Sequence, residues 1–466
     1  MPKLQTNGAK QKRTTYMILL LWAAVCFALL VVDWCCWAPN RLDADMASEQ
    51  LLANLLAQEG GVMSTNWYYS TELRVLNTQL VMAPLFRLFT SWHIVRVVGS
   101  VVLILLYLAA WFWFGRSAKL KYSGLLGAGL LVLPYGALYR QYVLEGLYYI
   151  PHITISFVVL GCAVRILRGG RRLAPAAGMV LFSFAAALGG PRQLFILNIP
   201  LTVAAALLAN AWRTPGGALL VPTLAADAAA LVGYVVNAKV LAEKYHFQDQ
   251  GYVAFTGLNL DRLQWFVNAL LASFGWQEGK VFSLAALFNL AAAALILFCF
   301  VFSVWLVRGK ARYPLGHRLV GAFFLAGAVC FALLYGLTNS GHSDRYLLPL
   351  AILFVPLLEI MLADCTPRHR PDARGLTALM AAILLLRAGT DYRAAAVATT
   401  PNQEAAQFLV QNGYRDGYAS FWDGNVMTEL TDGTLNVWTL TPNSVPELRP
   451  WLQVTSHLQT PPQGKI

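Results

Sequence analysis

Residues 16–61 decide the fold: YMILLLWAAVCFALLVVDWCCW (16–37) is followed by APNRLDADMASEQLLANLLAQEGG (38–61). The first part is long enough to cross a bilayer, which takes about 20 apolar residues. It is too long for a removed signal peptide and lacks a small-residue cleavage site, so we expect a retained membrane span. The basic N-terminal flank then belongs in the cytoplasm, and the acidic second part lies outside.

The composition of the whole chain supports a polytopic membrane protein. It has 466 residues, of which 58% are hydrophobic and 12% are charged, whereas soluble chains carry about 25% charged residues. The net charge of +12 comes from short basic clusters between apolar runs, which is typical of topology signals and argues against nucleic acid as a partner. The seven cysteines show no metal-ligand spacing, so the sequence predicts no metal site of its own.

Apolar runs predict about eleven transmembrane helices in an all-α fold. Basic residues cluster in alternate connecting segments, which puts the N-terminus in the cytoplasm and the C-terminus outside the membrane. The least secure spans are the fifth, which ends at Gly189-Gly190-Pro191, and the seventh, which carries Asp227. The expected spans are 16–37, 92–114, 122–139, 147–167, 174–189, 194–211, 218–241, 282–307, 319–337, 346–363 and 374–390.

Two long outer loops, 38–91 and 242–281, contain amphipathic helix signals. In the first loop, DMASEQLLANLLAQEGG carries an apolar stripe and predicts a helix along the membrane surface that ends at Gly60-Gly61. In the second loop, LNLDRLQWFVNALLASFGW predicts a helix with aromatic side chains suited to the membrane interface.

The chain divides into a transmembrane domain, 1–391, and an extracytoplasmic α+β segment, 392–466. PNQEAAQFLVQNGY predicts a short helix, and GYASFWDGNVMTELTDGTLNVWTL predicts two or three strands with turns at Asp423-Gly424 and Asp432-Gly433. The sequence stops at PPQGKI soon after these strands, which suggests the truncated end of a longer protein.

The polar residues that need an explanation gather on the outer side of the membrane. Charges near hydrocarbon are costly and tend to line polar cavities, so we expect an active site at the outer face. Its candidate residues are Asp43, Asp45, Glu49, Tyr69, Glu72, Arg192, His342 and Arg345.

Asp43 and Asp45 directly follow the first span, and Asp45 and Glu49 share one helix face. A partly desolvated carboxylate can act as a general base on an acceptor hydroxyl. The alternative is a helix N-cap, which favours aspartate at the same positions. Tyr69 fits either a substrate site or an aromatic belt at the interface.

SGHSDRYLLP sets His342, Asp344 and Arg345 where the tenth span begins. A helix N-terminus beside a guanidinium can hold a phosphate. The alternative is an Asp344 cap with Arg345 reaching the lipid headgroups. Arg192, in GGPRQ, is a weaker candidate of the same kind.

These features together resemble the GT-C superfamily of integral-membrane glycosyltransferases. The resemblance rests on Asp43-Ala44-Asp45 after the first span, a surface helix, a stretch with Glu72 before the second span, and Arg345-Tyr-x-x-Pro late in the chain. NWYYSTELRVLNTQL and GYASFWDGN also resemble bacterial membrane proteins. The first aspartates of this chain are not adjacent to each other, so the resemblance leaves open which of them is the base.

The resemblance implies inverting transfer of a sugar from a polyprenyl-phosphate donor, with Asp45 or Asp43 as base, Glu72 as the second acid and Arg345 at the lipid phosphate. The expected partners are this lipid-linked donor, an envelope glycan, lipid or protein acceptor, and membrane lipids. A divalent cation is compatible with this chemistry. The rival functions are a lipid or polysaccharide transporter, which would need polar groups near the midplane, and a catalytically inactive scaffold.

Overall fold

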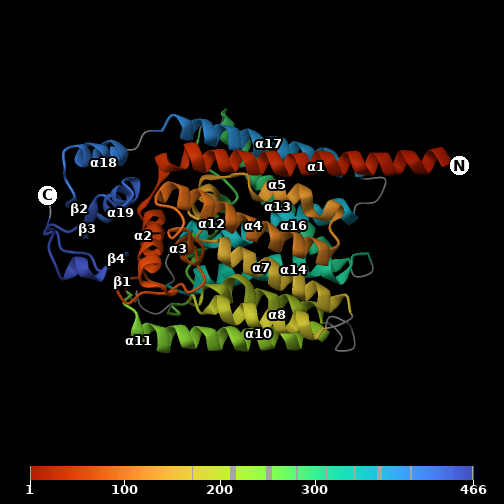
Figure 1. The fold of residues 1–466 in the computed structure, drawn as a ribbon. Coiled ribbons are helices and arrows are strands. Elements are labelled where there is room, and N and C mark those ends of the chain that lie inside the picture. The colour runs from red at the N-terminus through yellow and green to blue at the C-terminus, as the bar shows by residue number, and fades with distance from the viewer. Residues whose placement is uncertain are drawn as a thin grey trace.

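The computed structural model describes residues 2–169, 172–209, 217–247, 254–279, 282–309, 312–339, 343–364, 370–398, 401–463 and 465. Helices make up 73% of the protein and run roughly parallel in one bundle (Figure 1). The C-terminal segment and helices α2 (Ala44–Glu59) and α3 (Gln79–Leu85) lie at one end of this bundle. This end is called the outer end below, after the orientation that the loop charges predict.

Within the described residues, eight helices are long and apolar enough to span a bilayer, which confirms a polytopic, all-α membrane protein. They are formed by α1 (Pro2–Cys36), α4 (Trp92–Ala118), α7 (Ile150–Leu167), α10 with η5 and α11 (Gly217–Lys244), α13 (Leu284–Arg308), α14 (Leu315–Leu337), η6 with α15 and α16 (Asp344–Asp364), and α17 (Arg370–Ala396).

Three of the eleven expected spans depart from a regular membrane helix. The fifth and sixth are shorter apolar helices, Leu173–Ala187 (α8) and Leu194–Leu208 (η4 and α9). The third is broken into η2 (Lys121–Gly124), α5 (Leu125–Leu131), α6 (Ala137–Tyr139) and the π-helix η3 (Arg140–Glu145). It still crosses the bundle, since Gly124 accepts a hydrogen bond from Trp111 of α4 and Glu145 pairs with Arg41 at the outer end.

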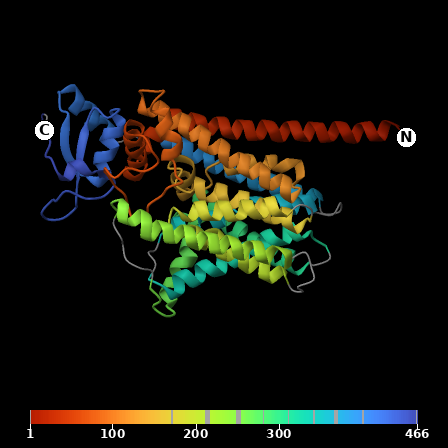
Figure 2. The same ribbon diagram turned by 60° about the horizontal axis from the view of Figure 1, so that its bottom comes forward.

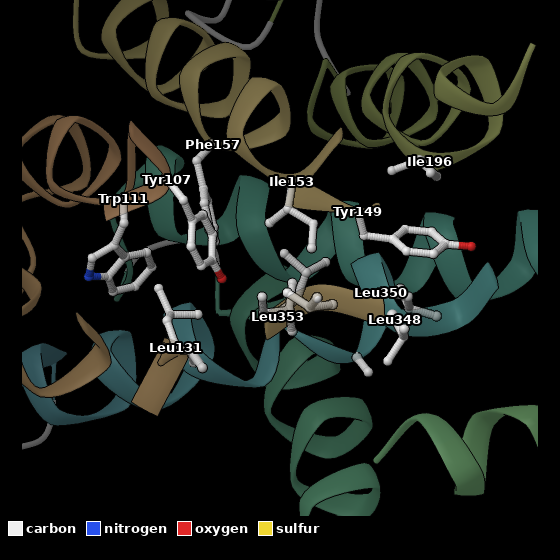
Figure 3. Close-up of a cluster of buried hydrophobic side chains, with 14 of the residues drawn as sticks. Tyr107, Trp111, Leu131, Tyr149, Ile153, Phe157, Ile196, Leu348, Leu350 and Leu353 are labelled. Atoms are coloured by element: carbon white, nitrogen blue, oxygen red, sulfur yellow. The ribbon is translucent and has the colours of Figure 1, made fainter. Parts of the chain in front are cut away.

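Aromatic and aliphatic side chains from α4, α5, α7 and α15 fill the interior of the bundle (Figure 3). The Phe157 ring lies 5.2 Å from Trp111 and 6.0 Å from Tyr107, and all three side chains are buried. A methyl group on Gly127 would lie 2.4 Å from the Trp111 ring, so glycine is required for α5 to approach α4 this closely.

A buried ion network fixes the outer ends of α1, η3 and α17. Arg41, in η1 (Ala38–Arg41), pairs with Asp33 at 2.6 Å and also with Glu145. Arg140 lies 3.3 Å from Glu145 and 3.7 Å from Asp391 of α17. Buried charges are stable only when they are paired, so this network holds the segment 140–149 rigidly at the outer end.

Helix α2 lies across the outer end of the bundle, as expected for a surface helix (Figure 1). Its stripe is not directed at lipid, because Met46, Leu52 and Leu56 are buried and α2 packs against α3 and α19 (Phe421–Leu430). In the second outer loop, α12 (Leu260–Ser273) forms where its amphipathic pattern predicts, with Asn259 as its N-cap.

The C-terminal segment contains α18 (Pro401–Gln411), α19, η7 (Thr455–Leu458) and three strands: β2 (Asp416–Ser420), β3 (Asn436–Leu440) and β4 (Gln453–Val454). Strands β2 and β3 pair in parallel. The composition boundary at 391 falls inside α17, which continues to Ala396. The turn at Asp432-Gly433 forms with positive φ at both residues.

The turn expected at Asp423-Gly424 is wrong, because both residues lie in α19. Ser420 stands at the N-cap, and its hydroxyl donates a 2.7 Å hydrogen bond to the Asp423 carboxylate at N3. A serine followed three residues later by an acid is a helix-start signature. This local signal and the burial of α19 against α2 outweigh the turn propensity of Asp-Gly.

The C-terminal segment docks on the first outer loop (Figure 2). Strand β1 (Trp67–Tyr68) pairs antiparallel with β4. Arg96 of α4 binds Glu429 of α19 at 2.6 Å, and Asn425 donates to the Ser48 hydroxyl at 2.8 Å. Elements separated by more than 300 residues therefore form one polar layer above the bundle.

Membrane sidedness is tested by cysteine labelling in a background without the native cysteines. Gln407 is exposed on α18 at the outer end, and Arg116 is exposed near the opposite end of α4. We predict that a membrane-impermeant maleimide labels Gln407→Cys in intact cells and labels Arg116→Cys only after permeabilisation. The reverse pattern would contradict the orientation and every site assignment that depends on it.

Candidate active site

Asp43 is the N-cap of α2, as the cap alternative predicts. Its Oδ1 accepts a 2.8 Å hydrogen bond from the Met46 backbone N–H. The same carboxylate accepts from Gln141 Nε2 at 2.9 Å and from the Tyr148 hydroxyl at 3.2 Å. Three donors occupy Asp43, so its role is to fix the start of α2 against the segment 140–149.

Asp45 lies in the first turn of α2 and has far fewer contacts. Among the described residues, its one polar partner is Arg345, whose Nη1 is 3.9 Å from Asp45 Oδ2. The Asp45 side chain is 34% exposed to solvent. Burial and the neighbouring charge of Asp43 raise its pKa, while Arg345 and Arg74 pull that pKa down. Asp45 therefore has the accessibility and proton affinity of a general base.

Arg345 lies in the 3-10 helix η6 (Asp344–Leu347), at the outer start of the tenth crossing. Its guanidinium carbon lies 5.1 Å from the centre of the Tyr142 ring. Its Nε is buried and has no hydrogen-bond partner among the described residues. The sequence also proposed His342 here, but His342 lies outside the described residues. Arg345 is therefore a cation held against Tyr142, with its Nη1 facing Asp45.

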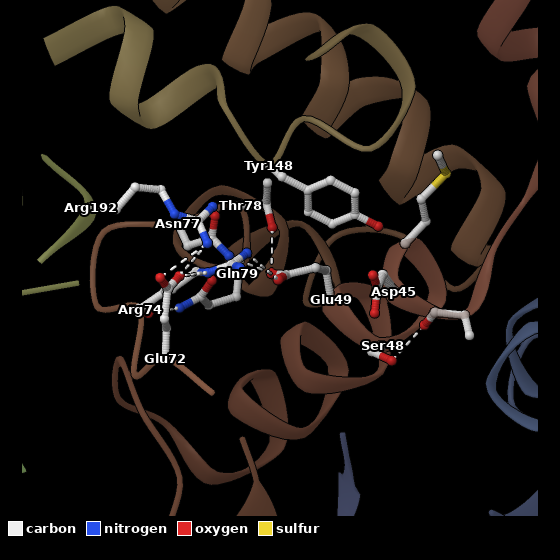
Figure 4. Close-up of polar contacts among 12 residues, drawn as sticks. Asp45, Ser48, Glu49, Glu72, Arg74, Asn77, Thr78, Gln79, Tyr148 and Arg192 are labelled. Atoms are coloured by element: carbon white, nitrogen blue, oxygen red, sulfur yellow. Dashed lines mark hydrogen bonds and ion pairs between the residues drawn. The ribbon is translucent and has the colours of Figure 1, made fainter. Parts of the chain in front are cut away.

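Glu72 and Arg192 form a second, tighter cluster beside Asp45 (Figure 4). Arg192 Nη2 is 2.9 Å from Glu72, and Arg74 Nε is 3.3 Å from the same carboxylate. Burial would raise the pKa of Glu72, but the charges of Arg192 and Arg74 outweigh burial and lower it. Glu72 is thus an ionised structural partner of two arginines.

Glu49 extends this cluster toward Asp45. Its Oε2 accepts hydrogen bonds of 2.7 Å from Asn77 and from Thr78, and Arg74 lies 3.9 Å from Oε1. Figure 4 shows Glu49 between Asp45 and the arginine pair. This arrangement places Glu49 as the link between α2 and the loop that carries Glu72.

Arg192 is less available for a ligand than Arg345. Its guanidinium carbon lies 5.5 Å from the Tyr149 ring and 5.2 Å from the Tyr346 ring, and its charge is neutralised by Glu72. Burial raises the pKa of Tyr149 to about 12, so this tyrosine is a neutral donor at pH 7. Of the two arginines, Arg345 has the weaker carboxylate partner.

Tyr69 is buried beneath the cluster. Its hydroxyl accepts a 2.9 Å hydrogen bond from the Ser64 backbone N–H, and its ring meets Tyr245 edge-on. Burial raises its pKa. Tyr69 lines a small cavity together with Glu49 and Glu72. Its observed contacts support the loop that carries Glu72.

Several residues of this site were missed in the sequence. Gln141, Tyr142 and Tyr148 lie in LYRQYVLEGLYY (138–149), a stretch rich in tyrosine at the end of an apolar run. The many tyrosines of this stretch could have indicated a binding site, although the sequence does not predict its π-helical turn. Arg449 of the C-terminal segment was also missed. Its guanidinium lies 5.0 Å from the Phe421 ring and within electrostatic range of Asp45.

A metal was tested against the acidic residues of the site. Among the described residues, no group of three His, Cys, Asp or Glu side chains converges on one point. Asp43 is already occupied by three donors. The described residues of the site do not form a cation site, and the reaction proposed below uses no metal.

No model of a known protein family matches the chain, and a comparison with curated proteins also finds no match. Among solved structures, the chain is similar to the oligosaccharyltransferase of Archaeoglobus fulgidus, crystallised with a tethered acceptor peptide, at a TM-score of 0.46 and 10% identity. The match covers 91% of this chain and 63% of that chain, so this chain spans less than two thirds of that protein's length. The likeness concerns the fold alone.

A stability measurement distinguishes the structural role of Asp43 from the role of Asp45. Asp43→Ala removes a helix cap, so we predict a loss of about 1–2 kcal/mol of stability and a lower melting temperature in detergent. Asp45→Ala should leave the melting temperature nearly unchanged, because Asp45 makes no hydrogen bond with the described residues. Equal destabilisation by both changes would contradict this division of roles.

Proposed function

We propose that the protein is an integral-membrane glycosyltransferase that moves a sugar from a polyprenyl-phosphate donor to an acceptor at the outer face. The observation that carries this proposal is the pair of Asp45 and Arg345, 3.9 Å apart at the outer end. A carboxylate that makes no hydrogen bond with the described residues and a neighbouring cation are the two groups that such a transfer needs.

In the proposed reaction, Asp45 accepts the proton of the acceptor hydroxyl. The hydroxyl oxygen forms a bond to the anomeric carbon of the donor sugar as the bond from that carbon to the phosphate oxygen breaks. The electron pair of the broken bond stays on the phosphate, and Arg345 stabilises the added negative charge. Attack opposite the leaving phosphate inverts the anomeric configuration.

The donor phosphate and its lipid fit the position of Arg345. Arg345 opens a membrane crossing, so a phosphate bound there lies at the membrane boundary while the polyprenyl chain stays in the bilayer. Helix α12 borders η6, and Ser273 donates to the Asp344 carbonyl at 2.9 Å. Trp265 in the middle of α12 and Trp276 just after its end are each 42% exposed, as suits side chains at a membrane interface.

The described residues give less support to a transporter. Asp227 is the acid nearest the middle of a predicted span, and its Oδ2 accepts a 2.6 Å hydrogen bond from Thr202 of the neighbouring helix. This contact gives Asp227 a role in joining α9 to α10. An inactive scaffold is distinguished from the enzyme by the variants below.

Arg345 is tested by binding of a short-chain polyprenyl phosphate to purified protein. Loss of a charged hydrogen bond costs about 1.5–3 kcal/mol, so Arg345→Ala should weaken binding roughly ten- to a hundredfold. Arg345→Lys keeps the charge without the guanidinium fork and should cost a fraction of that. Arg87→Ala, an exposed arginine at the same end, is the matched control. Unchanged affinity in Arg345→Ala would move the phosphate site to Arg192.

Asp45 is tested by the rate of sugar transfer and its pH dependence. Asp45→Asn should abolish transfer without changing polyprenyl-phosphate binding, because the amide cannot accept a proton. The ionised carboxylate is the active form and its pKa is raised, so transfer should fail on acidification at a higher pH than for an ordinary aspartate. Arg345→Ala removes a charge that lowers this pKa and should move the acid limb higher still.

Wild-type turnover in Asp45→Asn would show that Asp45 is not the base. The same assay after treatment with EDTA tests the metal requirement. Full activity is expected if Arg345 supplies the charge stabilisation alone.

A further inference from the structure

Arg449 belongs to the stretch LRPWL (448–452), which lies in the connection between β3 and β4 of the C-terminal segment. Its backbone N–H donates a 2.9 Å hydrogen bond to the Thr439 carbonyl of β3. Its own carbonyl accepts from the Trp451 N–H at 2.7 Å and from the Gln453 side chain of β4. These bonds join Arg449 to both strands, so its backbone has a fixed position.

The LRPWL stretch lies against the face of α2 that carries Asp45. Asp45, Ser48 and Glu49 share this face, because residues three and four apart on a helix are neighbours. Asn425 donates to the Ser48 hydroxyl at 2.8 Å and to the Leu452 carbonyl at 2.9 Å. Leu452 also lines a small cavity with Ser48 and Glu49. The C-terminal segment therefore brings Arg449 to the Asp45 side of α2.

The Arg449 side chain lies against two aromatic rings. Its guanidinium carbon is 5.0 Å from the centre of the Phe421 ring and 5.1 Å from that of Trp451. Such contacts orient a guanidinium without using its N–H donors in hydrogen bonds. With the described residues, this guanidinium makes no hydrogen bond and no ion pair. Arg449 is therefore an oriented cation whose donors are available to a ligand.

The lack of a carboxylate partner distinguishes Arg449 from the paired arginines of the outer end. Burial lowers the pKa of Arg449, and the charge of Asp45 offsets this effect only in part. In Arg41 and Arg192, carboxylate partners outweigh burial and raise the pKa. A partly buried cation without such a partner is stabilised when an anion binds beside it. The surroundings of Arg449 thus favour a negatively charged ligand.

Arg449 and Arg345 belong to parts of the structure that lie on opposite sides of α2. Figures 1 and 2 show α2 between the bundle, which carries Arg345, and the C-terminal segment, which carries Arg449. Arg345 opens a membrane crossing and is the proposed contact of the lipid phosphate. Both arginines act on the charge of Asp45. An anion at Arg449 would therefore enter from the aqueous side, with its neighbouring hydroxyl groups near Asp45.

We propose that Arg449 binds a carboxylate or phosphate group of an anionic glycan, and that this glycan is the acceptor of the transferase proposed above. The planar guanidinium fork fits either anion. The Trp451 ring is half-buried and offers an apolar face to the carbon–hydrogen face of a sugar. Asp45 stays free to accept the proton of a hydroxyl on the same glycan. The role of acceptor rests on the proposed function, whereas anion binding rests on the surroundings of Arg449.

The experiment measures binding to the full-length protein in detergent by titration calorimetry. The acceptor probes are trigalacturonic acid, which carries carboxylates, and a glycerol phosphate trimer, with neutral maltotriose for comparison. A short-chain polyprenyl phosphate is the donor probe. We expect at least one anionic trimer to bind more tightly than maltotriose. Arg449→Ala should weaken that binding roughly ten- to a hundredfold and leave polyprenyl phosphate binding unchanged. Arg345→Ala should have the opposite pattern.

Arg415→Ala, an exposed arginine of the same C-terminal segment, is the matched control and should bind every probe like wild type. Arg449→Lys keeps the charge, so it should lose only part of the affinity, and it reports on binding even where Arg449→Ala is unstable. The inference is overturned if neither anionic trimer binds, if maltotriose binds equally well, or if both Arg449 variants bind the trimers like wild type. It is also overturned if Arg449→Ala weakens polyprenyl phosphate binding instead, which would assign Arg449 to the donor. Full transfer by Asp45→Asn would overturn the proposed function and leave the anion site intact.

Discussion

The anchoring of Asp43 is the interaction on which the site depends. A helix that starts directly after a membrane span could leave the bundle in many directions. Asp43 caps α2 and at the same time binds Gln141 and Tyr148, which belong to the segment between the third and fourth crossings. The start of α2 is thereby fixed to the bundle, and Asp45 is directed toward Arg345.

The cost of charge in hydrocarbon explains where the other parts lie. Ion pairs with little exposure, such as Arg41 with Asp33 and Arg96 with Glu429, collect at the outer end. They tie α1, α4 and the C-terminal segment to one polar layer. The two arginines of the site then differ by their partners: Arg192 lies 2.9 Å from Glu72, whereas Arg345 lies 3.9 Å from Asp45 and its Nε has no partner among the described residues.

Hydropathy and loop charge were enough to predict the polytopic fold and the amphipathic helices α2 and α12, because these patterns depend on local sequence. The sequence could not predict which of Asp43 and Asp45 has its carboxylate occupied by hydrogen bonds, since this depends on partners about 100 residues away in the chain. The break in the third span was also missed, although it lies between α5 and α6 at Pro134-Tyr135-Gly136, where proline removes a backbone hydrogen bond of the helix. The prediction of a turn at Asp423-Gly424 was wrong, because Ser420 at the N-cap and burial against α2 favour a helix there.

The most direct test of the central claim is mass spectrometry of envelope glycans from cells that carry wild-type protein, no protein, Asp45→Asn or Asp43→Asn. Asparagine can replace aspartate as an N-cap, so Asp43→Asn should keep the wild-type glycan. Deletion and Asp45→Asn should each yield the same glycan lacking one sugar unit. A wild-type glycan in cells with Asp45→Asn, or no difference between deletion and wild type, would contradict the account.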